Sequence, residues 1–341
     1  MLGLAAAALA GEVRRYAVVV GTNDGLPGDA PLEYAELDAD RVAAVLEGLG
    51  DVRSEDIVTL RHVDADRVRA ALDELGARID RAGASETLLY FYYSGHADAE
   101  ALHLDGTRLG FGELTAALER VPVDVRVVVV DACQSGELTR LKGAIPAEPF
   151  TISAEDRLDA HGMAIITSSS AGEDAQESDR LRGGMFTHHF LAGLMGAADS
   201  TRDHRITLPE AYLYARTETI RATSQARFVQ HPAYAFELRG EQDLVLTRTE
   251  DPGRNAVLSL SDPGSWLVFA SGDRGQLVTE VAVEGTAEVL VPPGQYLVRN
   301  HTARGVWERP VTLDRGGTVT LRVADMAPVS YGATVRKGLE P

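Results

Sequence analysis

Two apolar runs in the first half of the chain end in polar side chains that have no role in packing. The first run, LLYFYY, is followed by Ser94, Gly95 and His96, and the second, VVVV, by Asp131 and then Cys133. In an open parallel sheet the ligand crevice lies at the carboxyl ends of the strands. If these runs are neighbouring strands, His96 and Cys133 meet at one edge, where the imidazole could take the thiol proton and leave a nucleophilic thiolate.

Cys133 is the single cysteine of the chain, which excludes an internal disulfide and any zinc or iron–sulfur centre built on several cysteines. A lone cysteine beside an apolar strand is usually a small buried hydrophobe. Here the flanking Asp, Gln, Ser and Gly are unsuited to a core. The sequence therefore favours a chemical role for this thiol.

The motifs around these residues resemble those of caspase-like cysteine peptidases, particularly the bacterial branch allied to metacaspases and paracaspases. YYSGH ends one strand, DACQSG ends the next, GGMFT opens a later helix, and LEYAELDA (32–39) matches the turn from the first strand into the first helix. Asp131 stands where caspases have Gln, so the pattern is closer to that of metacaspases. The resemblance covers about residues 14–239 and implies a cysteine endopeptidase that works through a thioacyl-enzyme.

By this resemblance His96 is the base and Cys133 the nucleophile, and backbone N–H groups near Gly95 and Cys133 form the oxyanion hole. The family usually has Gly after the histidine, whereas this chain has Ala97. If that position required a positive φ, Ala would add strain of about 1 kcal/mol.

The resemblance places Asp131 at the floor of the S1 pocket, which holds the P1 residue on whose carboxyl side the substrate is cut, with Ser94 beside it. A carboxylate two residues before the nucleophile could accept a bidentate Arg or a Lys, so we expect a protein or peptide substrate with Arg or Lys at P1. Alternatively, Asp131 merely caps the following turn.

Asp174 and Glu177, with Glu173, lie where the later substrate-binding loop of the family is expected, and we assign Asp174 and Glu177 to S1. A caspase that cuts after Asp would need arginines there instead. Arg180 and Arg182 are close enough in sequence to keep that alternative open.

Segment 137–160 has no strong period and contains two prolines, which predicts a long exposed loop and a preferred site of nicking. Arg140 and Lys142, and less often Arg157, are the expected self-processing sites.

We predict no metal or cofactor. Asp98, Glu100 and Asp105 could bind calcium, as some metacaspases do, but the EF-hand spacing is absent and a solvated acidic loop is favoured. His188 and His189 face about 100° apart on a helix, which disfavours a shared metal.

Charge and hydropathy limit the partners and the compartment. The net charge of −18 would repel a phosphate backbone, so nucleic acid is not an expected partner. No apolar run reaches the ~18 residues of a membrane-spanning helix. Residues 1–10, MLGLAAAALA, look like the end of a secretory signal, which would make the protein exported or periplasmic; otherwise it is cytoplasmic.

Residues 14–248 alternate short apolar runs with helical periodicity, which predicts a mainly parallel sheet flanked by helices. The expected strands are 16–21, 57–60, 88–94, 125–131, 164–168 and 234–238, and the expected later helices are 112–119, 185–195 and 208–223.

After a linker at 249–254 the period changes to two, which predicts a small antiparallel β-sandwich over 255–325 and a tail over 326–341. Its VPPGQYLV run resembles bacterial carboxypeptidase-regulatory-like and PEGA modules. Residues 1–13 are a possible signal-like segment, of which residues 1–10 are left out of the predicted fold. The competing function is a catalytically silent caspase-like scaffold whose pocket binds a peptide or partner.

Overall fold

The computed structural model describes residues 13–84, 86–133, 161–170, 173–224, 228–239, 244–250, 255–271 and 277–329. The chain divides into two compact units, Met1–Asp251 and Pro252–Pro341. The first unit carries the motifs that could do chemistry.

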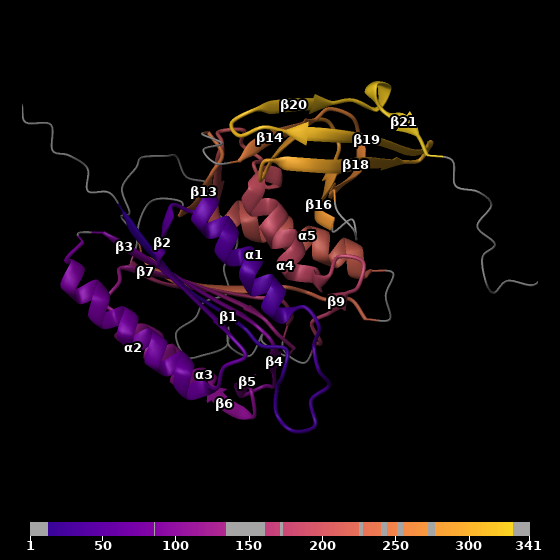
Figure 1. Cartoon of the computed structure of the whole chain (residues 1–341). Coiled ribbons are helices and arrows are strands. Elements are labelled where there is room, and N and C mark those ends of the chain that lie inside the picture. The colour runs from indigo at the N-terminus through magenta and orange to yellow at the C-terminus, as the bar shows by residue number, and fades with distance from the viewer. Residues whose placement is uncertain are drawn as a thin grey trace, which may run out of the picture. The chain divides into compact units, whose positions relative to one another are not determined.

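A six-stranded sheet in the order β12-β8-β7-β3-β1-β2 forms the centre of the first unit (Figure 1). Five strands run parallel, and β12 pairs antiparallel with β8. The strands are β1 (Arg14–Gly21), β2 (Val52–Arg61), β3 (Thr87–Ser94), β7 (Val125–Asp131), β8 (His161–Thr167) and β12 (Ala233–Arg239). The predicted mainly parallel α/β sheet, with its sixth strand, is confirmed.

Helices cover both faces of this sheet. Helices α2 (Ala65–Ala82) and α3 (Phe111–Arg120) lie on one face, and α1 (Ala35–Gly48) lies on the other (Figure 1). All eight residues of β3 are buried, which explains why this strand reads as a continuous apolar run rather than as an alternating one.

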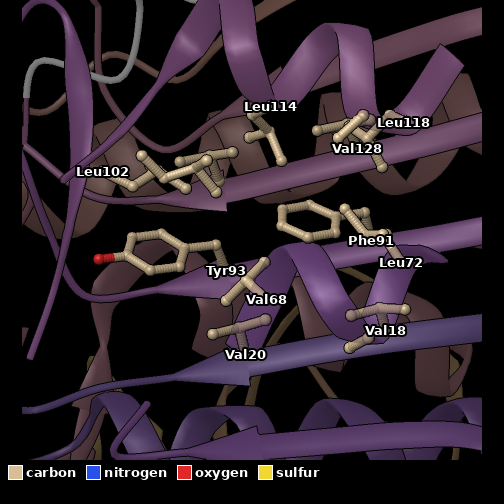
Figure 2. Close-up of a cluster of buried hydrophobic side chains, with 14 of the residues drawn as sticks. Val18, Val20, Val68, Leu72, Phe91, Tyr93, Leu102, Leu114, Leu118 and Val128 are labelled. Atoms are coloured by element: carbon tan, nitrogen blue, oxygen red, sulfur yellow. The ribbon is translucent and has the colours of Figure 1, made fainter. Parts of the chain in front are cut away.

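The core between the sheet and its α2–α3 layer is built from side chains of both helices and of several strands (Figure 2). Phe91 of β3 is 1% exposed and packs in one cluster with Leu72 of α2 and Leu114 of α3. Burying each such side chain contributes about 1.5–3 kcal/mol. The packing of this layer therefore holds the carboxyl end of β3 in a fixed position.

A small antiparallel sheet of β4 (His96–Ala97), β5 (Ala101–Leu104) and β6 (Thr107–Gly110) follows β3 immediately. His96 is a register partner of His103 on β5. The side chain of His96 therefore projects from a paired strand rather than from an unsupported loop.

The predicted helix over 185–195 is shorter and changes type: α4 (Met185–Ala192) continues as a π-helical turn, Gly193–Ala197. Gly196 has a φ of 119°, in the left-handed region where glycine is favoured, and ends the helix. Helix α5 (Leu208–Thr223) begins at the predicted residue because Thr207 and Glu210 form a capping box.

Four short strands form two further antiparallel pairs in the first unit. The hairpin of β9 (Glu177–Ser178) and β10 (Gly183–Gly184) leads into α4, and β11 (Arg205–Thr207) pairs with β13 (Val245–Arg248). Within the described residues no helix is long and apolar enough to cross a membrane.

The described part of the second unit consists mostly of strands, which form a three-stranded sheet, β17-β14-β20, and a five-stranded sheet, β16-β15-β18-β19-β21. In β16 buried and half-buried residues alternate along the whole strand, as the period-two pattern predicts. The strands are β14 (Ala256–Leu260), β15 (Gly264–Ala270), β16 (Leu277–Val283), β17 (Ala287–Val291), β18 (Gly294–Thr302), β19 (Gly305–Leu313), β20 (Thr318–Leu321) and β21 (Ala327–Pro328).

Candidate active site

The register of two parallel strands brings the candidate catalytic residues together. Strands β3 and β7 are neighbours, and Ser94 lies opposite Asp131 at their carboxyl ends. His96 and Cys133 each follow two residues after this pair. Both line one pocket, whose full lining is Leu32, Ser94, Gly95, His96, Asp131, Cys133, Ala175, Gln176, Glu177 and Gly184.

The ring of His96 has a defined orientation. Its Nε2 lies 2.7 Å from the carbonyl oxygen of Ala30. A carbonyl can only accept, so Nε2 carries a proton, and in the neutral ring Nδ1 presents its lone pair. In this tautomer Nδ1 is the atom of His96 that can act as a base.

Cys133 is a half-buried free thiol whose Sγ lies 3.9 Å from the carbonyl oxygen of Ala175. Burial raises the pKa of this thiol, and the negative charges of Asp174 and Asp131 raise it further. The resting sulfur therefore carries its proton, and attack on a substrate requires a base that removes it.

The structure corrects one of the predicted oxyanion donors. The N–H of Gly95 donates to the carbonyl of Asp131 at 3.2 Å, which extends the hydrogen bonding between β3 and β7. Because that donor is already used, Gly95 is wrong as an oxyanion group.

Ala97 is placed better for that role than Gly95. The N–H of Asp98 donates to the carbonyl of Ala101 at 3.0 Å, and hydrogen-bonded pairs alternate with non-bonded pairs in an antiparallel ladder. The Ala97–Leu102 pair is therefore non-bonded, which leaves the N–H of Ala97 directed away from β5. Ala97 also lies in extended β4, so it carries none of the left-handed strain considered above.

Asp131 is 5% exposed, and its Oδ2 accepts hydrogen bonds from the Thr187 hydroxyl at 2.6 Å and the Thr187 backbone N–H at 3.2 Å. Thr187 lies in the first turn of α4, so this carboxylate satisfies an N-terminal amide of a distant helix. The alternative in which Asp131 caps the turn after its own strand stays a prediction, because the residues after Cys133 lie outside the described part of the chain. Burial raises the pKa of Asp131, and the Thr187 hydrogen bonds oppose that rise.

A second buried carboxylate, Asp38, was missed in the sequence. It is 1% exposed; its Oδ2 accepts from the Gly184 N–H at 2.6 Å and its Oδ1 lies 3.1 Å from Arg41. Burial raises its pKa to about 7, the charge of Asp131 adds to the rise, and Gly184 and Arg41 oppose it. The sequence feature that could have identified Asp38 is its position in the LEYAELDA motif, where a charged residue follows apolar helical positions.

The later loop contributes one of its two predicted acids to the pocket. Glu177 lines the pocket, and its carboxylate accepts the N–H groups of Glu33 and Tyr34, both at 3.1 Å. Asp174 is exposed and is not among the lining residues, although its charge reaches Cys133. Neither Arg180 nor Arg182 lines the pocket.

The remaining candidates lie away from the pocket or outside the described residues. Asp98 Oδ2 lies 3.0 Å from His103 Nε2 and 2.7 Å from the guanidinium of Arg108, so this acid is not fully solvated. His188 and His189 are both buried in α4. Arg140, Lys142 and Arg157 fall outside the described residues.

A family model described as the caspase domain matches residues 14–241, which span both candidate catalytic residues and the whole central sheet. No curated protein matches the chain. Among solved structures, the crystal structure of Caspase-1 from Spodoptera frugiperda is similar, at a TM-score of 0.47 and 12% identity, over 71% of this chain and 92% of that one.

Proposed function

The chain belongs to the caspase family of cysteine peptidases, and from this premise we propose that it is an endopeptidase that cleaves proteins after Arg or Lys with a Cys133–His96 dyad. The observation that carries the proposal is one pocket in which a thiol, an oriented imidazole and a buried carboxylate lie together.

In the proposed reaction His96 Nδ1 accepts the proton of Cys133, and Sγ attacks the carbonyl carbon of the substrate. The oxyanion is stabilised by the N–H groups of Ala97 and Cys133. His96 then gives its proton to the leaving amine, which leaves a thioacyl-enzyme. In the second half-reaction His96 removes a proton from water, which attacks the thioester, and Cys133 leaves as the thiol.

The preference for a basic P1 residue is supported by the charges around the pocket. Asp131 and Glu177 are lining residues, and Asp38 lies directly behind Gly184. A P1 guanidinium or ammonium would find carboxylate acceptors there, whereas a P1 Asp would add a like charge to the same site, a penalty of several kcal/mol.

Two irreversible affinity labels test this proposal directly. A peptidyl-Arg chloromethylketone should alkylate Cys133 much faster than the peptidyl-Asp equivalent, and Cys133→Ala should not be labelled. Intact mass and a peptide map give the extent and the site. Faster labelling by the Asp reagent would overturn the specificity, and equal labelling of Cys133→Ala would overturn the nucleophile.

A second candidate function is a catalytically silent scaffold that binds a peptide in the same pocket. The observation that favours it is the raised pKa of Cys133, because a thiol among acidic groups is poorly ionised. Iodoacetamide separates the two functions. An active dyad reacts at Cys133 and loses that reactivity in His96→Ala, whereas a scaffold thiol reacts slowly in both proteins.

A further inference from the structure

A second histidine lies buried behind the candidate base. His103, on β5, is 7% exposed. Its Nδ1 lies 2.8 Å from Asp29 Oδ2, and its Nε2 lies 3.0 Å from Asp98 Oδ2. The ring therefore bridges two carboxylates that belong to separate segments of the chain.

Both carboxylates are held in their charged form. Burial raises the pKa of Asp29, but the Leu26 N–H and the His103 ring lower it below its usual value. Burial likewise raises the pKa of Asp98, and hydrogen bonds from the Glu100 N–H and His103 lower it overall. Each ring nitrogen of His103 therefore faces a charged carboxylate oxygen.

Asp29 joins this network to the candidate base through a single peptide bond. The next residue, Ala30, supplies the carbonyl that accepts the His96 Nε2–H. Asp29 Oδ2 also accepts the Leu26 N–H at 2.7 Å, which closes the loop on itself. A Cβ added at Gly25 would lie 2.2 Å from Asp29 Oδ2 and 2.9 Å from His96 Cδ2, so the loop, the carboxylate and the ring are in close contact.

The side chain of Tyr93 also links the backbones of the two histidines. The Tyr93 hydroxyl lies 2.7 Å from the carbonyl oxygens of both His96 and His103. The turn after β5 holds the same loop, because the Gly106 N–H donates to the Gly25 carbonyl at 2.9 Å. His103 is therefore positioned by rigid elements, and the loop that orients His96 is positioned by His103.

We propose that His103 is a positioning residue: by binding Asp29 it places the Ala30 carbonyl that holds His96 as its Nε2–H tautomer. This inference rests on the proposed function, in which His96 Nδ1 is the base. Without the His103 link the loop would move relative to β4, and His96 would exchange between tautomers, only one of which presents Nδ1 to the thiol.

The variant His103→Gln tests the proposal, and Arg108→Gln is its matched control. Arg108 pairs with Asp98 on the outer side of the network and is 46% exposed, so its loss should leave the loop in place. For His103→Gln we expect kcat to fall about ten- to a hundredfold, as is typical when a partner that orients a functional histidine is lost. KM for a P1-Arg peptide and the inhibition constant of benzamidine, a P1-Arg mimic, should stay within about twofold, since S1 is unchanged.

A second readout needs no substrate. With 15N-labelled histidine, His96 should give the nitrogen shifts of the Nε2–H tautomer in wild type, and averaged shifts in His103→Gln. Because the titratable groups Asp29, Asp98, Glu100 and His96 and the charged Arg108 lie near this ring, spectra are compared at one pH. If His103→Gln fails to fold, judged by its melting temperature, Asp29→Asn should show the same kcat loss and the same averaged shifts.

An unchanged kcat together with an unchanged His96 tautomer in the folded variant would overturn the proposal. A parallel loss of benzamidine binding would also overturn it, because that would show general damage to the pocket. If the wild-type protein has no peptidase activity but its His96 tautomer still depends on His103, the proposed function is wrong. The positioning role of His103 is then still supported.

Discussion

Ser94 and Asp131 are register partners at the carboxyl ends of the parallel neighbours β3 and β7. These two residues end their strands, and the chain reaches His96 two residues after Ser94 and Cys133 two residues after Asp131. The identical offset is what brings the imidazole and the thiol to one pocket. A shift of one residue in this register would turn the side chains of one strand to the opposite face and separate the two groups.

Cys133→Ala and His96→Ala should each abolish peptidase activity, lowering kcat by at least about a thousandfold. The double variant should be no worse than either single variant, because the two groups act as one unit. Progress curves with a P1-Arg peptide measure this, and circular dichroism checks the fold. Near-normal turnover by folded Cys133→Ala would exclude the dyad.

Asp131→Asn should reduce kcat/KM for P1-Arg peptides by about a hundredfold while leaving P1-Gln peptides much less affected, because it removes one carboxylate but keeps the shape that Thr187 contacts. Asp174→Asn is the matched control, since that acid is exposed and is not a lining residue. Equal effects of the two variants would contradict the placement of S1.

The raised pKa of Asp38 predicts that the preference for a basic P1 residue depends on pH. Burial raises its pKa to about 7, so it is neutral below that pH and charged above it. The ratio of kcat/KM for P1-Arg to that for P1-Gln should therefore rise about tenfold from about pH 6 to about pH 8. Taking the ratio cancels any titration of the dyad, which both substrates share.

Asp38→Asn controls for this effect, because the amide cannot ionise. In Asp38→Asn, the ratio of kcat/KM for P1-Arg to that for P1-Gln should be lower than in wild type and should not change over the same pH range. A ratio that rises equally in wild type and Asp38→Asn would assign the titration to another group.

Gly184→Ala should destabilise the first unit and disturb S1 together. A Cβ there would lie 2.4 Å from Asp131 Oδ2 and 3.3 Å from Asp38 Oδ2, where buried atoms cannot move aside. Such overpacking costs about 1–3 kcal/mol, which corresponds to a loss of about 2–10 °C in melting temperature.

The control Gly112→Ala lies in the first turn of α3 with nothing within 4 Å of the new Cβ. It should be neutral or more stable by about 0.5–1 kcal/mol. Differential scanning calorimetry compares the two variants. Equal stability of both would show that the Asp131–Asp38 site is not close-packed.

Self-processing after Arg140 or Lys142, and less often after Arg157, stays a prediction, since these residues lie outside the described part of the chain. Their tethering a few residues after Cys133 gives a high effective concentration. Intact-mass measurement of wild type beside Cys133→Ala decides it. Cuts of equal extent in both proteins would indicate a contaminating protease.

The sequence by itself was sufficient for the sheet, the order of its strands along the chain and the two candidate catalytic residues. An apolar run that ends in polar residues can be recognised from neighbouring positions in the sequence alone. The carboxyl ends of parallel strands always lie at one edge of the sheet, so the residues that follow two such runs can be expected to meet. The predicted helix over residues 208–223 has the same bounds in the structure, and its start is set locally by the capping box of Thr207 and Glu210.

Only the tertiary structure decided the electrostatics of the site. Asp38 meets the Gly184 N–H from 146 residues away, and His103 meets Asp29 from 74 residues away. The Gly95 N–H is used because β7 lies beside it. Burial, pKa and the availability of a donor depend on which distant segments pack together, and hydrophobic periodicity carries no information about those pairs.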